Sequence, residues 1–169
     1  MELTFKVISI ISGVNTALLV GIILWRFLVW SRGISPVLYR LGKGLARKKI
    51  SVFARPEHLT SIEHMLLDSG IFPKKNILSV SDQNEISRAE TASLYLVHWK
   101  SFEEHIDAIL KMKQDSVGLI VFAPQNEGFV SAEKMAILSN TRNTSLTNFR
   151  GRLLSDILVS MMTIGYAQK

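Results

Sequence analysis

Side chains that bind anions and bases recur directly after the apolar runs of this sequence. Asn148, Arg150 and Arg152 form the densest group, within the stretch NFRGR that precedes the last apolar segment. Two guanidinium groups beside the backbone N–H groups of a helix start suit a phosphate or a carboxylate. Trp99 or Phe149 would be able to stack on a nucleotide base. The candidate ligand-binding residues are Arg55, His58, His98, Trp99, Gln125, Asn126, Asn148, Arg150 and Arg152.

An ion pair would also explain the arginines of the NFRGR stretch. An arginine at a helix start is electrostatically disfavoured unless it is paired, and Asp156 and Glu133 are available partners. The sequence leaves both readings open.

The local motifs of well-known catalytic and metal sites are absent from the sequence. It contains no G-x-G-x-x-G, G-x-x-x-x-G-K-[ST], H-E-x-x-H or G-x-S-x-G, and the histidines are not at metal-ligand spacing. The absence of cysteine excludes disulfides and thiolate metal sites. Ser61 and Ser101 have no evident base partner and are typical helix-start residues, Ser101 with Glu104 as a capping box. We therefore predict no catalytic residue, no metal site and no cofactor.

The elements that would position these residues alternate between short β-branched runs and longer amphipathic stretches. This alternation is typical of a parallel sheet covered by helices. We predict an α/β fold, a flavodoxin-like or small Rossmann-like three-layer sandwich with a mostly parallel five-stranded sheet. Its strands would end at one common edge, where ligands bind by default. The predicted strands are 50–54, 77–80, 93–97, 117–123 and 144–148, and the predicted helices are 57–68, 85–90, 101–113, 131–138 and 150–166.

An uncharged run of 19 residues, Val7 to Trp25, precedes the α/β pattern. As a helix it would extend about 28 Å, close to the thickness of a hydrocarbon core. We predict one transmembrane helix in residues 1–30, a basic connector in 31–49 and an α/β domain in 50–169. A cleaved signal peptide would carry its positive charge before the apolar run, and a buried helix of a soluble domain would rarely precede a basic cluster. These two alternatives are less consistent with the sequence.

The positive charge of the chain is concentrated at its beginning. The net charge is +6, but residues 1–56 alone hold nine basic residues and one acid, which leaves −2 for the rest. The basic residues follow the apolar run, so the positive-inside rule predicts an inner-membrane protein with its N-terminus outside and its domain in the cytoplasm. A short helix starting at Pro36 would lie along the inner leaflet. A mildly acidic domain predicts no binding to double-stranded nucleic acid.

Small residues recur every fourth position within the apolar run, at Ser9, Gly13, Ala17 and Gly21. Such a stripe lets two helix backbones approach closely in lipid, and Asn15 can add a hydrogen bond between helices. We therefore predict a homo-oligomer whose contact is this stripe.

The chain also resembles two families of prokaryotic proteins. The stretches ISVFA and LLDSG, with Trp99 followed by Glu103 and Glu104, look somewhat like a TIR domain. That resemblance implies cleavage of NAD, with Glu103 or Glu104 as the alternative catalytic residue. The overall plan of one span, a basic connector and a small Rossmann-like domain resembles membrane-anchored CARF-type sensors. This second resemblance implies a cyclic oligoadenylate as a second messenger, in antiviral defence.

Three functions thus remain open from the sequence. The first is an oligomeric, non-enzymatic membrane effector that senses a nucleotide-like anion. The second is a membrane-tethered enzyme that hydrolyses NAD or another nucleotide. The third is a membrane scaffold whose domain binds only a protein partner.

Overall fold

A computed structural model describes residues 2–164 of the chain. The chain divides into two compact units, Met1–Tyr39 and Arg40–Lys169. Side chains are not described for residues 2–11, 40, 41 and 43–47, so the side chain of Ser9 in the small-residue stripe lies outside the described part. The same holds for residues 165 and 166, the end of the last predicted helix.

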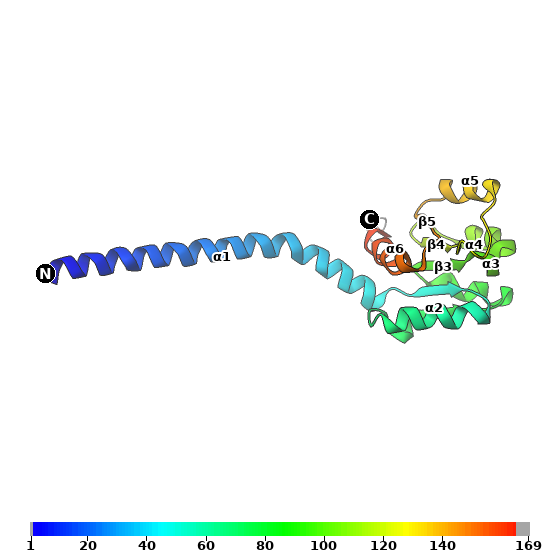
Figure 1. The fold of residues 1–169 in the computed structure, drawn as a ribbon, viewed down its shortest axis with the longest axis horizontal. Helices are drawn as coiled ribbons and strands as arrows, with labels where there is room; N and C mark the ends of the chain where they lie inside the picture. Colours follow the sequence, from blue (N-terminus) through cyan, green and yellow to red (C-terminus); the bar gives the residue numbers. More distant parts are fainter. Residues whose placement is uncertain (1, 165–169) are drawn as a thin grey trace. The chain divides into compact units, whose positions relative to one another are not determined.

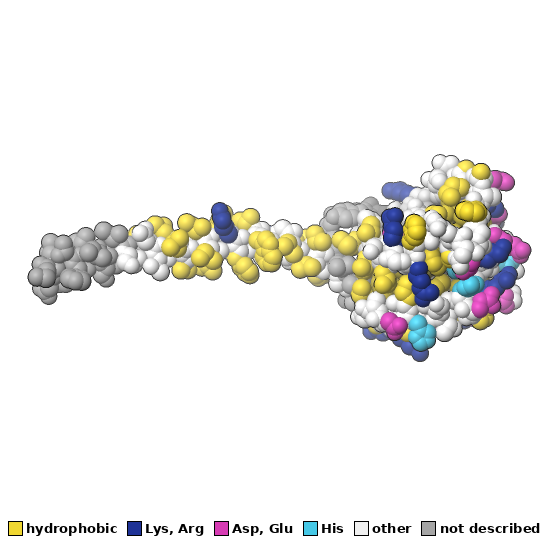
Figure 2. Space-filling view, in the orientation of Figure 1, with side chains coloured by type: hydrophobic (Ala, Val, Ile, Leu, Met, Phe, Trp, Pro, Cys, Tyr) yellow, Lys and Arg dark blue, Asp and Glu magenta, His cyan; other side chains and the backbone are white. Residues whose placement is uncertain are grey.

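The first element is a long helix, α1 (Glu2–Arg47). Its segment Ser12–Tyr39 is long and apolar enough to cross a membrane, and none of that segment is buried. Apolar side chains cover the described part of α1 in Figure 2. The predicted separate helix starting at Pro36 is wrong, because α1 continues through this proline to Arg47. A proline inside a helix costs one backbone hydrogen bond, and here the helix persists on both sides of it.

The α/β unit is built on one sheet with the strand order β2-β1-β3-β4-β5, in which all neighbours are parallel. The predicted five-stranded parallel sheet is therefore confirmed. The chain leaves β1 towards β2 on one side and returns to β3 on the other, so the strand order reverses between β1 and β3. The strands are β1 (Ile50–Phe53), β2 (Ile77–Val80), β3 (Leu94–His98), β4 (Gly118–Phe122) and β5 (Thr144–Thr147).

Helices cover both faces of this sheet (Figure 1). On one face, α2 (Pro56–Asp68) and α6 (Arg150–Thr163) bury Leu66 and Ile157 against Leu96 and Ile120. The other face is covered by the 3₁₀ helix η2 (Gln83–Thr91), by helices between β3 and β4, and by α5 (Ala132–Asn140). A further 3₁₀ turn, η1 (Lys74–Asn76), leads into β2. The central strands β1, β3 and β4 are buried on both faces, which explains their mostly apolar sequences.

The predicted helix over 101–113 is divided into three parts. These are α3 (Trp99–Phe102), the 3₁₀ turn η3 (Glu103–His105) and α4 (Ile106–Met112). The backbone departs from helical angles at Phe102 and His105, with φ values of −130° and −105°. Ser101 lies inside α3 and does not cap a helix, so the predicted capping box with Glu104 is wrong.

Two local contacts fix α6 against the rest of the unit. Gly118 at the start of β4 has no side chain, and a Cβ atom there would overlap the side-chain ends of Ile164 and Leu94. The second contact comes from Lys48, just before β1, whose Nζ donates a hydrogen bond of 2.9 Å to the carbonyl oxygen of Met161 in α6. The segment that follows α1 is thus bonded to the last turns of α6.

Candidate functional site

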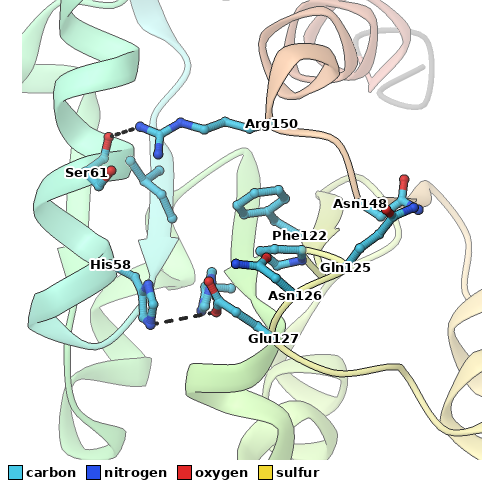
Figure 3. A pocket seen from close by; sticks show the side chains of 11 residues that line it. His58, Ser61, Phe122, Gln125, Asn126, Glu127, Asn148 and Arg150 are labelled. Carbon is cyan, nitrogen blue, oxygen red and sulfur yellow. Dashed lines mark hydrogen bonds and ion pairs between the residues drawn. The ribbon is translucent and has the colours of Figure 1, made fainter.

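A pocket of about 460 Å³ lies at the carboxyl edge of the sheet, on the face covered by α2 and α6. Figure 3 shows its lining side chains converging from α2, from the loop after β4 and from the start of α6. This is the edge at which open parallel sheets bind ligands, next to the reversal of strand order between β1 and β3. The lining residues are His58, Ser61, Ile62, His98, Phe122, Pro124, Gln125, Asn126, Glu127, Asn148 and Arg150.

Six of the nine predicted ligand-binding residues line this pocket. They are His58, His98, Gln125, Asn126, Asn148 and Arg150.

The other three predicted residues lie elsewhere. Arg55 and Arg152 are exposed and do not line the pocket. Trp99 is 4% exposed and belongs to the core on the opposite face of the sheet, so its indole cannot stack on a base in the pocket. Phe149, between two lining residues, is 52% exposed and stays available for stacking.

Local backbone structure explains how His58 and Glu127 reach the pocket. Pro56 at the first position of α2 starts that helix, because its fixed φ suits a helix start, and His58 follows in the first turn. Glu127 closes a turn in which its N–H donates to the carbonyl oxygen of Pro124 at 3.0 Å. Gly128 then takes a φ of +117°, a conformation that side chains rarely tolerate. The chain is thereby turned so that Glu127 stays at the edge of the sheet.

His98 is the most buried polar residue of the pocket, with 1% exposure. Its Nδ1 atom is 2.9 Å from the Oγ atom of Ser101, and its ring stacks on that of His58 with centroids 4.1 Å apart. Burial lowers the pKa of His98, and the neighbouring His58 lowers it further, against a smaller opposing effect of the Glu127 carboxylate. The net effect of these neighbours is a pKa of His98 below the ordinary histidine value.

Glu127 faces both imidazoles. Its Oε2 atom is 3.0 Å from Nε2 of His98 and 3.8 Å from Nε2 of His58. The first contact is an ion-pair distance, and this buried oxygen is among the side-chain oxygens without a hydrogen-bond partner in the described structure. Nε2 of His58 is also 3.9 Å from Oε1 of the exposed Glu57. Two imidazole nitrogens and one carboxylate oxygen thus meet at the pocket wall.

Arg150 lines the opposite part of the pocket. Its Nη2 atom donates a hydrogen bond of 3.1 Å to the backbone carbonyl oxygen of Ser61 in α2, as Figure 3 shows. This bond uses one of the five N–H donors of the guanidinium group. Among the described residues, the ion pair expected with Asp156 or Glu133 is not formed by either arginine of α6. Arg150 therefore lines the pocket without an ion pair to any carboxylate in the described part of the chain.

The glutamates proposed as alternative catalytic residues are outside this pocket. Glu103 and Glu104 belong to η3, and Oε1 of Glu103 is 3.4 Å from Nζ of Lys100. Neither glutamate lines the pocket wall.

Five of the lining residues were not among the nine candidate ligand-binding residues from the sequence. Glu127 is the only one of them with a titratable side chain, and its position beside Gln125 and Asn126 after the strongest strand was the one available signal. The other four are Ser61, Ile62, Phe122 and Pro124.

The chain matches no family model, no curated protein and no solved structure.

Proposed function

We propose that this chain is a single-pass membrane protein whose α/β domain senses a nucleotide-like anion at the carboxyl edge of a flavodoxin-like sheet. The strand order β2-β1-β3-β4-β5 is the order of flavodoxin-like proteins, whose ligands bind where the order reverses. The pocket lies at that place, and its volume of about 460 Å³ falls within the range of small-molecule sites.

The observation that carries the proposal is the chemistry of the pocket wall. Arg150 supplies a guanidinium group for an anionic group, while Gln125, Asn126 and Asn148 supply amide donors and acceptors. Phe122 and Ile62 give an apolar surface for the uncharged part of the ligand. A phosphate linked to a planar base combines these three kinds of contact.

The proposal places α1 across the inner membrane, with the α/β domain in the cytoplasm. The length and apolarity of Ser12–Tyr39 and the basic residues after this segment support it. Gly13, Ala17 and Gly21 are exposed on α1, and a Cβ atom at either glycine would have no neighbour within 4 Å outside the backbone of the helix itself. This face is therefore open for contact with a second copy of the helix, and such oligomerisation would let the protein signal. Signalling requires a different ligand affinity in two states of assembly.

The test measures nucleotide binding to the full chain in detergent by isothermal calorimetry. The panel contains AMP, ATP, NAD and cyclic oligoadenylates, and the matched variants are Arg150→Ala and Arg152→Ala. We expect saturable binding of at least one nucleotide, weakened at least tenfold by Arg150→Ala, because a guanidinium-to-phosphate contact is lost. Arg152→Ala removes the same charge from the same helical turn but outside the pocket, and should change the affinity less than twofold.

Two results would overturn the proposal. Failure of every nucleotide to bind would leave a membrane scaffold that recognises a protein partner. Equal losses from both arginine variants would mean that general charge, and not the pocket, attracts the anion. Chromatography of the same mixtures adds a check. Conversion of NAD or of a cyclic oligonucleotide would show that the protein is a membrane-tethered enzyme and not a sensor.

A further inference from the structure

We propose that His58, His98 and Glu127 form a binding site for one divalent transition-metal ion, for which zinc is the best fit. Each residue offers one ligand atom, and these three atoms lie within 4.8 Å of one another. The residues come from α2, from the end of β3 and from the loop after β4, so the fold and not a local motif assembles them.

The types of ligand atom determine the class of ion. Two imidazole nitrogens and one carboxylate oxygen are a common set for zinc, whereas magnesium and calcium prefer oxygen ligands alone. A divalent cation would also satisfy Oε2 of Glu127, the buried oxygen without a hydrogen-bond partner in the described structure.

Two of the three distances between ligand atoms are close to those of a tetrahedral site. Zinc bonds of 2.0–2.2 Å place neighbouring ligand atoms about 3.3 Å apart. Oε2 of Glu127 is 3.0 Å from Nε2 of His98 and 3.8 Å from Nε2 of His58. The side chain of His58 is one-third exposed, so a rotation of this ring can bring its nitrogen into line.

Ser101 supplies the outer contact that metal-binding histidines usually have. With Nε2 of His98 on the metal, the ring proton resides on Nδ1, which donates to Oγ of Ser101 at 2.9 Å. Ser101 is 9% exposed and lies one helical turn after His98, so this contact is fixed by α3. The hydroxyl group thereby selects the ring orientation in which Nε2 faces Glu127.

The site would have an open coordination position. Three protein ligands leave the fourth tetrahedral position of zinc unfilled, and the three residues line the pocket. A water molecule or an anionic group can take that position. Metal binding itself needs no nucleotide, so this inference is independent of the proposed function.

The test is a zinc titration of the full chain in detergent, after removal of bound metal with a chelator. Competition with a chromophoric chelator measures the affinity, and replacement by Co²⁺ gives a visible absorption band that reports tetrahedral coordination. We expect one equivalent of Zn²⁺ per chain. His58→Ala and Glu127→Gln should each weaken binding at least tenfold, and Ser101→Ala should weaken it about tenfold by freeing the His98 ring.

His64→Ala is the matched control, because His64 is exposed on the same helix as His58 but away from the cluster. It should leave the affinity within twofold of the original protein. His98 is buried, so its replacement also changes packing, and the test therefore relies on the two less buried ligands. The inference would be overturned by the absence of stoichiometric binding, or by binding that survives both substitutions. Zinc is titrated in the absence of any nucleotide, which separates this result from that of the nucleotide test.

Discussion

Arg150 and Ser61 connect the first turn of α6 to the middle of α2 across the wall of the pocket, through a hydrogen bond from the guanidinium group to a backbone carbonyl oxygen. The acceptor is a main-chain atom, so the contact does not depend on the side chain of Ser61. The bond orients Arg150 in the pocket while leaving most of its donors for another partner.

We expect Arg150→Ala to change the free energy of unfolding by only about 0.5 kcal/mol, because Arg150 is an exposed residue that loses one hydrogen bond. Urea denaturation followed by far-UV circular dichroism measures this. This result matters for the nucleotide test. If Arg150→Ala weakens nucleotide binding without lowering the free energy of unfolding, the loss is due to the missing contact in the pocket. A destabilisation above about 2 kcal/mol would instead make Arg150 a structural residue.

The stability of the α/β unit should fall at alkaline pH because of Tyr95. Burial in the central strand β3 raises the pKa of the Tyr95 phenol above its ordinary value. The unfolded chain then loses this proton near pH 10 while the folded chain keeps it, so folding is fully stabilised below about pH 10 and progressively less so above it.

Tyr95→Phe removes this proton and keeps the ring that contacts Phe53 edge to face. The free energy of unfolding of the variant should therefore decline less than that of the original protein between about pH 9 and 11. Tyr39→Phe, at an exposed position of α1, is the control and should follow the original curve. Parallel curves for Tyr95→Phe and the original protein would contradict the prediction.

Gly118 should tolerate only a small side chain. A Cβ atom at this position would be 2.8 Å from Cδ1 of Leu94 and would also overlap Cδ1 of Ile164. Both are ends of side chains that can shift, so we expect Gly118→Ala to cost about 1 kcal/mol and Gly118→Val about 3 kcal/mol. Ile164→Ala combined with Gly118→Ala should recover part of the loss in a double-mutant cycle measured by urea denaturation. Strict additivity of the two substitutions would show that the overlap is relieved elsewhere.

Self-association of α1 should depend on its small-residue stripe. Gly13→Ile and Ala17→Ile add bulk on one face of the helix and should reduce dimerisation in a membrane reporter assay severalfold. Ile22→Phe adds bulk on the opposite face and serves as the control. An unchanged signal from both stripe variants would exclude this face as the contact.

The membrane topology can be measured directly. We expect the intact chain to stay with the membrane fraction after carbonate extraction, because Ser12–Tyr39 would span the lipid. Protease added outside intact cells should leave the α/β domain uncut, and should cut it after the inner membrane is opened. Release by carbonate or cleavage from outside would contradict the predicted anchor or its orientation.

The central strands β1, β3 and β4 were predictable because each is a short, mostly apolar run. Leu119, Ile120 and Val121 of β4 have no exposed surface, and such complete burial requires a continuous apolar run. The helices between β3 and β4 were less predictable. Phe102 and Ile106 both point into one core, so their spacing fits a continuous helix as well as the three short pieces observed.

The position of the site at the carboxyl edge was predictable from the parallel topology of the sheet. The side chains that turn into the pocket at this edge were not all predictable. The rule that strand ends share one edge led to His58, His98 and Arg150. The same rule selected Trp99, which immediately follows β3, but it does not state to which face of the sheet a side chain turns. The cluster of His58, His98 and Glu127 has no local spacing to recognise, because its members come from three different connections of the sheet.

The bond from Lys48 to the carbonyl oxygen of Met161 ties the residue directly after α1 to the helix that carries Arg150. This helix begins with Arg150 in the pocket, and its 14 residues make a rod about 21 Å long. Lys48 is bonded to the last turn of this helix, at the opposite end from Arg150. A substitution of Lys48 would therefore act on the end of α6 that is farthest from Arg150 and the pocket.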